Sequence, residues 1–130
     1  MLANSLNPEF YKDWLAHIVD SETKDAFIYI AGYAACLSDY NCHPQFKGKN
    51  GPVRDFRFID AEGKLPFAFI VNQQWLLFYL RKPAISSGRY TLETIKSTFP
   101  SVTKNESGEW TIKIKSLPDA KLLTRILGLK

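Results

Sequence analysis

The stretch VRDFRFIDAEGKLPFAFIVNQQWLLFYLRK, residues 53–82, decides the fold. It holds three runs rich in aromatic and β-branched residues, separated by turn-forming residues, which is typical of strands. The runs cover residues 53–60, 66–72 and 75–82. Because the connections between them are short enough for hairpin loops, the pattern predicts an antiparallel meander.

Two helices are predicted before this meander. Asn7 can cap a helix over residues 8–18, because the proline and glutamate that follow it suit the first helical turn. Asp20 or Ser21 can cap a second helix that runs to about residue 37. Its middle, AFIYIAGYAACL, is apolar nearly all round, which indicates a buried helix.

Two loops, a strand and two helices complete the prediction. Turn-forming residues predict loops over residues 41–52 and 83–89. We expect a helix over residues 92–99 capped by Thr91, a strand over residues 110–115, and a last helix opened by Ser116-Leu117-Pro118-Asp119 and closed by Gly128. The order ααβββαβα predicts one α+β domain over residues 1–130, with a mainly antiparallel sheet of about four strands.

Alternation along the strands separates two faces of this sheet. Arg54 shares a face with Phe56 and Phe58, whereas Arg57 points the other way. Residues 75–82 are apolar on both faces, so this strand is expected to be central and covered on both sides. Three cations are predicted to line a solvent-exposed face, joined at its rim by three more: Arg57, Lys113 and Lys115, then Lys47, Lys49 and Arg54. The alternative is that they are ordinary solvating charges.

Charge is unevenly distributed along the chain. Residues 1–40 carry two cations and six acids, net −4, whereas residues 41–130 carry fifteen cations and seven acids, net +8. A cationic surface attracts polyanions, so the sequence predicts a nucleic-acid-binding module in which those six cations contact phosphates. Trp75 and Tyr79 are candidate stacking rings.

Two alternatives remain open. The first is a protein-interaction domain, an accessory or inhibitor subunit, that binds a partner or a second copy through the helix of residues 21–37. The second, and weaker, is a metal-dependent nuclease, because Asp55 followed by Glu62-Gly63-Lys64 fits a loose acid and E-x-K pattern. Residues 60–64 favour a turn, however, so we expect no enzyme.

No metal or cofactor is expected. The six-residue step from Cys36 to Cys42, even with His43, does not match the paired spacing of zinc ligands. The loop KGKNG lacks the spacing of a phosphate-binding P-loop.

From Gly63 onward the chain resembles the MmcQ/YjbR-like proteins, small bacterial domains with a CyaY-like fold. The matching segments are GKLPFAFIV, WLLFYLRKP, FPSV, GEWTIKIKS and LPDAKLL. Members of that family are suspected of binding DNA through a wing-like sheet, so the resemblance implies DNA binding here. The two N-terminal helices and the basic loop depart from the pattern.

The sequence predicts a cytoplasmic protein. Its start, MLANSLNPEF, lacks the basic and apolar regions of a signal peptide, and its two cysteines are expected to be free thiols. The longest apolar run has twelve residues, 26–37, which is too short to cross a membrane.

Overall fold

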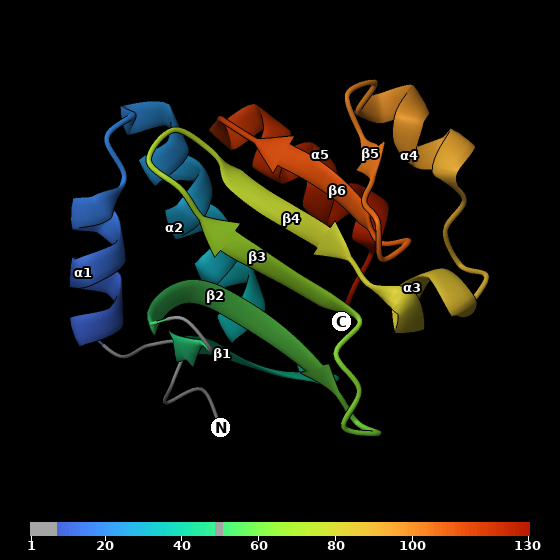
Figure 1. Ribbon diagram of the computed structural model, residues 1–130, viewed down its shortest axis with the longest axis horizontal. Coiled ribbons are helices and arrows are strands. Elements are labelled where there is room, and N and C mark those ends of the chain that lie inside the picture. Colours follow the sequence, from blue (N-terminus) through green and yellow to red (C-terminus); the bar gives the residue numbers. More distant parts are fainter. Residues whose placement is uncertain (1–7, 49–50) are drawn as a thin grey trace.

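The computed structural model describes residues 8–48 and 51–130, with side chains over residues 11–45 and 54–130. Helices α2 and α5 lie behind an antiparallel sheet of six strands, so the fold is α+β as predicted (Figure 1). The helices are α1 (Pro8–His17), α2 (Ser21–Ala35), α3 (Lys82–Ser86), α4 (Leu92–Thr98) and α5 (Leu117–Leu127). The strands are β1 (Tyr40–Gly48), β2 (Gly51–Asp60), β3 (Phe67–Val71), β4 (Leu76–Leu80), β5 (Thr103–Lys104) and β6 (Trp110–Ile114).

The strands follow the order β1-β2-β3-β4-β6-β5. The predicted meander is confirmed, because β2, β3 and β4 are antiparallel neighbours in that order. The prediction of about four strands is wrong, since β1 and the two-residue β5 were missed.

Most of the predicted loop over residues 41–52 is instead strand, because residues 41–48 belong to β1 and residues 51–52 to β2. Cys42 and Pro44 are buried, whereas Asn41 is exposed and His43 and Gln45 are half-buried, so the segment does alternate as a strand. Proline is compatible with this position because β1 is an edge strand, where a missing N–H donor breaks no second ladder.

A second difference concerns the predicted loop over residues 83–89. Part of it forms the short helix α3, because Pro83 stands in the first turn, where its fixed φ and missing N–H are tolerated. The turn-forming residues follow this helix, and Gly88 adopts a φ of 74° there.

The predicted helix caps of α2 and α5 are confirmed. The Asp20 carboxylate accepts a hydrogen bond from the Thr23 backbone N–H at 3.0 Å and begins α2. The Ser116 hydroxyl accepts from the Asp119 N–H at 3.4 Å, and Asp119 in turn accepts from the Lys115 N–H at 3.1 Å. Gly128, with a φ of 57°, ends α5.

Aromatic rings form most of the core between the sheet and the helices. Phe56, Phe58, Phe67, Phe69 and Phe78 are all buried on the side that faces the helices. The rings of Phe56 and Phe69 stack with centroids 5.0 Å apart.

Helix α2 adds Phe27 and Ile30 to the core. It is not buried all round as predicted, because 49% of Ile28 is exposed. Its small residues Ala31 and Ala34 are buried within the chain, where α2 packs against α5 and the sheet. Among the described residues, no helix combines the length and the apolar character that crossing a membrane requires.

Candidate functional site

The second face of the sheet is not covered by a helix in the described part of the chain (Figure 1). We call it the open face; on β2, β3, β4 and β6 its side chains include those of Asp55, Arg57, Ala68, Ile70, Leu77, Tyr79, Thr111 and Lys113. The prediction that residues 75–82 are covered on both sides is wrong. Strand β4 is central, but Leu77 and Tyr79 are only half-buried, because no helix among the described residues packs over them.

A row of aligned residues crosses the open face. Arg57 is paired with Ala68, Ala68 with Tyr79, and Tyr79 with Thr111 on successive strands. The Ala68 methyl group is much smaller than the side chains on either side of it. A hollow of about 180 Å³ lies there, lined by Asp55, Arg57, Ala68, Ile70, Tyr79, Arg81 and Glu109.

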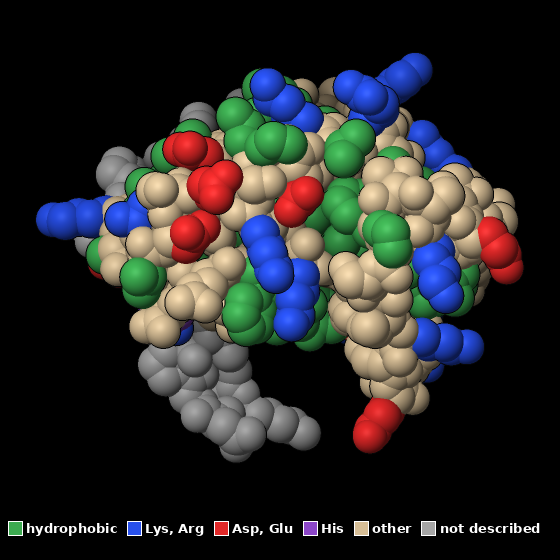
Figure 2. All heavy atoms as spheres, turned by 90° about the horizontal axis from the view of Figure 1, so that it is seen from above, with side chains coloured by type: hydrophobic (Ala, Val, Ile, Leu, Met, Phe, Trp, Pro, Cys, Tyr) green, Lys and Arg blue, Asp and Glu red, His purple; other side chains and the backbone are tan. Residues whose placement is uncertain are grey.

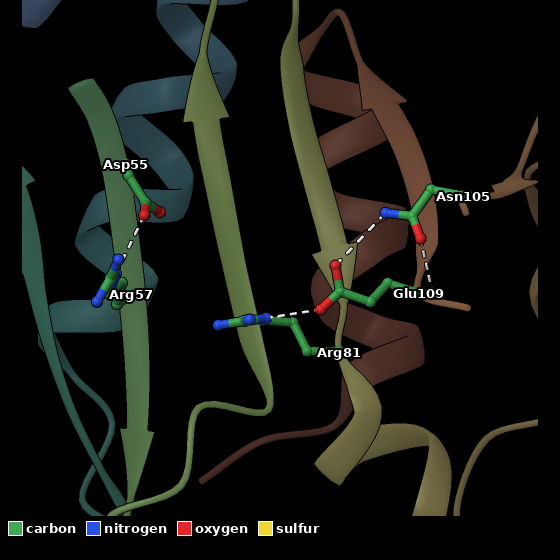
Figure 3. A network of polar contacts seen from close by, with 5 residues as sticks. All are labelled: Asp55, Arg57, Arg81, Asn105 and Glu109. Atoms are coloured by element: carbon green, nitrogen blue, oxygen red, sulfur yellow. Dashed lines mark hydrogen bonds and ion pairs between the residues drawn. The ribbon is translucent and has the colours of Figure 1, made fainter. Parts of the chain in front are cut away.

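Both arginines of this hollow are held by carboxylates. Arg57 Nε donates to Asp55 Oδ2 at 3.1 Å, and Arg81 Nε donates to Glu109 Oε2 at 2.8 Å. The Arg81 side chain reaches across β3 toward β2, so its guanidinium lies on the same side of the sheet as Arg57 (Figure 3). Because each ion pair uses Nε, the terminal guanidinium N–H groups are the donors that remain for a ligand.

The carboxylates also influence Tyr79 and are themselves positioned. Burial, together with the charges of Glu109 and Asp55, raises the pKa of Tyr79, while Arg81 opposes this change. Its phenol is therefore a neutral hydrogen-bonding group at physiological pH. Glu109 is oriented by Asn105, whose Oδ1 accepts from the Glu109 N–H at 2.9 Å (Figure 3).

Arg81 also borders a second hollow, of about 500 Å³, beyond the end of β4. Its lining includes the cations Lys64, Arg81 and Lys82 and a single carboxylate, that of Glu109. The formal charge of this lining is therefore +2, which favours an anionic ligand.

A third feature lies at the other end of β4. The Lys113 ammonium lies over the Trp75 ring, 4.5 Å from its centroid, which is cation–π geometry. The turn that holds Trp75 is fixed to the helices, because Gln73 O accepts from the Val19 N–H at 2.8 Å and Gln74 O accepts from the Thr23 hydroxyl at 3.0 Å. Trp75 is therefore a half-buried ring on a rigid support.

The six predicted cations are not all in one place. Arg57 and Lys113 point to the open face, and Lys115 is exposed directly after β6. Arg54 lies on the opposite, helix-covered face: partial burial and the Arg54 charge both lower the pKa of His17 in α1. Lys49 and the side chain of Lys47 lie outside the described residues.

Sequence reasoning missed the most constrained side chains of the site. Alternation from Trp75 and Tyr79 places Arg81 on the open face, and this signal was available. Its partner Glu109 is 28 residues away in the chain, and only the packing of the β5–β6 turn beside β4 brings the two together. Ala68 gave no signal, because a small residue in a strand is unremarkable without its neighbours.

The positions of Asp55, Glu62 and Lys64 do not support the nuclease hypothesis. Glu62 and Lys64 lie in the β2–β3 turn, where both of their backbone N–H groups donate to Asp60 Oδ1 at 2.9 Å. Asp55 is five residues back along β2, roughly 16 Å from Asp60 at the rise of an extended strand. The three side chains therefore do not converge on one metal ion.

The cysteines do not form a metal site either. Cys42 is buried on the helix side of β1, whereas the neighbouring His43 points to the other face, and Cys36 is exposed at the end of α2. Burial raises the pKa of Cys42 to about 12, so its thiol stays protonated. Within the described residues, no group of three or more His, Cys, Asp or Glu side chains is suited to a metal ion.

A larger hollow at the edge of the sheet has the wrong charge for a polyanion. It measures about 580 Å³ and lies where residues 37–41 meet residues 59–61. Asp39 and Asp60 line it, and its lining contains no Lys or Arg.

Charges on the side seen in Figure 2 are mixed. Lys and Arg side chains there lie beside acidic and hydrophobic ones, in separate groups rather than one continuous field (Figure 2). A polyanion on this side would therefore meet acidic as well as cationic side chains (Figure 2).

The comparisons with known proteins add no relative. No family model matches the chain, and neither a curated protein nor a solved structure matches it. The resemblance of residues 63–130 to the MmcQ/YjbR-like proteins stays a prediction.

Proposed function

We propose that this protein is a nucleic-acid-binding module that uses the open face of its sheet. The observation that carries the proposal is a sheet face that no helix of the described residues covers, with cations grouped at both ends of β4 and aromatic rings along it. Lys113 and Lys115 lie at one end, and Lys64, Arg81 and Lys82 lie at the other. The ends, Trp75 and Arg81, are six residues apart, roughly 20 Å along a strand, which is long enough for more than one phosphate contact.

The chemistry of these groups suits a phosphodiester backbone. Guanidinium and ammonium groups donate strong, charge-assisted hydrogen bonds to phosphate oxygens. Arg81 is pre-oriented by Glu109, so less side-chain freedom is lost when it binds a phosphate. The proposal also includes Lys47 and Lys49, the two further cations that the sequence predicts to contact phosphates.

DNA is the polymer that the MmcQ/YjbR-like resemblance implies, and the proposal includes no catalytic step. We infer a cytoplasmic location, which is consistent with the free thiols of Cys36 and Cys42.

The test is a titration of fluorescently labelled DNA and RNA at several salt concentrations. Each lost phosphate contact should flatten the log–log salt dependence by about 0.9 on duplex DNA or about 0.7 on a single strand. The double variant Lys113→Gln, Lys115→Gln removes two such contacts. The log–log slope should therefore flatten by nearly twice the single-contact value, and binding to all sequences should weaken alike. A second double variant, Lys47→Gln, Lys49→Gln, tests these two predicted contacts separately.

The matched control is Lys12→Gln, Lys121→Gln. It removes the same charge from exposed positions on α1 and α5, away from the open face, and should leave the salt dependence nearly unchanged. If this control flattened the salt dependence as much as Lys113→Gln, Lys115→Gln does, the assignment of binding to the open face would be contradicted. Absence of binding at low salt would overturn the proposal and favour the protein-interaction alternative, for which the exposed Ile28 of α2 is the starting point.

A further inference from the structure

The Lys113–Trp75 contact differs from the other cation contacts of the open face. Arg57 and Arg81 are both held by carboxylates, which neutralise much of their charge for an approaching phosphate. Lys113 instead lies over a ring, 4.5 Å from the centroid of Trp75. The face of this ring is therefore occupied by a flexible, exposed side chain that can move aside.

Because the charges of Arg57 and Arg81 are partly neutralised, electrostatic attraction to phosphates can supply only part of the binding affinity. A protein that binds duplex DNA through its backbone relies on many uncompensated cations, because each one releases counterions. Much of the affinity on this face must come from another source, and stacking of bases on aromatic rings is the usual one for flat sheet surfaces.

We propose that the open face, as the site of the proposed nucleic-acid binding, selects single strands, with an unpaired base stacked on Trp75. In the free protein Lys113 covers the ring. In the bound state it leaves the ring and contacts the phosphate next to the stacked base. The strand then follows β4 past Tyr79 toward Arg81. A duplex cannot make this contact without opening, because both faces of its bases are already stacked.

The geometry of Trp75 supports a preformed stacking platform. Its backbone carbonyl accepts from the Asn72 N–H at 3.0 Å, and the turn is anchored to α2 through Thr23. A ring that is fixed before binding loses little conformational entropy when a base stacks on it.

Tryptophan fluorescence gives a direct readout of this contact. The chain has three tryptophans, and Trp14 and Trp110 are 2% and 8% exposed, so a base can reach Trp75 far more readily. Titration with an unlabelled single-stranded oligonucleotide should quench the emission, and the fully complementary duplex should quench it much less. At the same salt concentration we expect the single strand to bind about tenfold more tightly, the scale of one stacked base.

Variants separate stacking from folding. Trp75→Leu should lose about tenfold in single-strand affinity and little in duplex affinity, whereas Trp75→Phe keeps a ring and should recover most of the loss. Leu122→Ala, which shortens an exposed apolar side chain on α5, away from the open face, is the control and should leave the single-strand affinity nearly unchanged. Thermal unfolding of each variant shows whether it is folded.

The outcomes distinguish this inference from the proposed function on which it rests. Equal binding of single strand and duplex without quenching would overturn the single-strand preference and leave nucleic-acid binding standing. A single-strand preference that survives in Trp75→Leu would overturn stacking at Trp75. Absence of binding to either polymer at low salt would overturn both proposals.

Discussion

The two faces of the sheet are made by alternate residues of the same strands, yet they have different physical roles. On β2, Phe56 and Phe58 are completely buried under the helices, whereas Asp55 and Arg57, which alternate with them, form a half-buried ion pair on the open face. Burial of the phenylalanines contributes to folding, because each removes a large apolar surface from water. The ion pair is partly exposed to solvent, which screens it, so it contributes about 1 kcal/mol or less. Stability should therefore depend on the helix-covered face and binding on the open face.

The largest change in stability is expected on α2. The side of this helix that packs against the sheet can be compared with its solvent-exposed side. Ile30 is 1% exposed and Ile28 is 49% exposed. Ile30→Asp buries an unpaired charge, which costs several kcal/mol after relaxation, comparable with the whole stability of a small domain. Ile28→Asp should change the free energy of unfolding by less than about 1 kcal/mol.

Urea unfolding followed by circular dichroism measures both variants. A soluble, cooperatively folding Ile30→Asp protein with the midpoint of Ile28→Asp would mean that α2 does not depend on its contact with the sheet.

Thr23 is the next test, because it joins the two regions. Its hydroxyl is buried and lies within hydrogen-bonding distance of Asp20 Oδ2 at 3.0 Å, Gln74 O at 3.0 Å and Lys115 O at 3.3 Å. One hydroxyl hydrogen serves only one acceptor at a time, so these contacts share it. Thr23→Val keeps the shape and removes the donor, which should cost about 1–3 kcal/mol.

Thr124→Val is the matched control. Thr124 is also buried, but its hydroxyl donates to the Lys121 carbonyl of its own helix at 3.1 Å. That carbonyl also lies within α5, where the helical hydrogen bonds satisfy it, so we expect a loss of less than about 1 kcal/mol. Equal losses in the two variants would show that Thr23 does not connect α2 to the β3–β4 turn.

What could be predicted from the sequence was mostly local. The caps at Asp20, Ser116 and Gly128 depend on residues within one helical turn, and alternation within residues 53–82 depends on neighbours two positions apart. Both follow from backbone geometry, so the helices α2 and α5 and the β2–β3–β4 meander were predicted within a few residues.

The errors came from features that depend on distant residues. Turn-forming residues concealed β1, because proline and glycine disfavour a central strand but are compatible with an edge. Whether a strand is central or at an edge depends on residues far away in the chain.

The site residues show the same division. Arg57 and Lys113 were assigned to the open face by alternation, which is local. The Arg81–Glu109 pair required the register of β4 and β6 and the path of the β5–β6 turn.

The smallest expected change in stability lies on the open face itself, at Ala68. This residue forms the floor of the 180 Å³ hollow between Arg57 and Tyr79. Ala68→Leu adds an apolar side chain to space that opens to solvent, without removing a charge or a core contact. We expect the free energy of unfolding to change by less than about 1 kcal/mol, because the added atoms need not displace the buried core. Binding of single-stranded DNA should nevertheless weaken about tenfold, the value of one strong charge-assisted contact, because the filled hollow separates the ligand from the terminal N–H groups of both arginines.

Ile70→Leu, a change of shape at constant volume on the same strand and face, is the control and should leave both the stability and the affinity nearly unchanged. Fluorescence anisotropy and urea unfolding on the same preparations measure the two effects. An Ala68→Leu protein with unchanged stability and unchanged affinity would show that the hollow is not part of the binding surface. A large loss of stability would instead show that the open face is packed as tightly as the helix-covered face and would contradict the division between them.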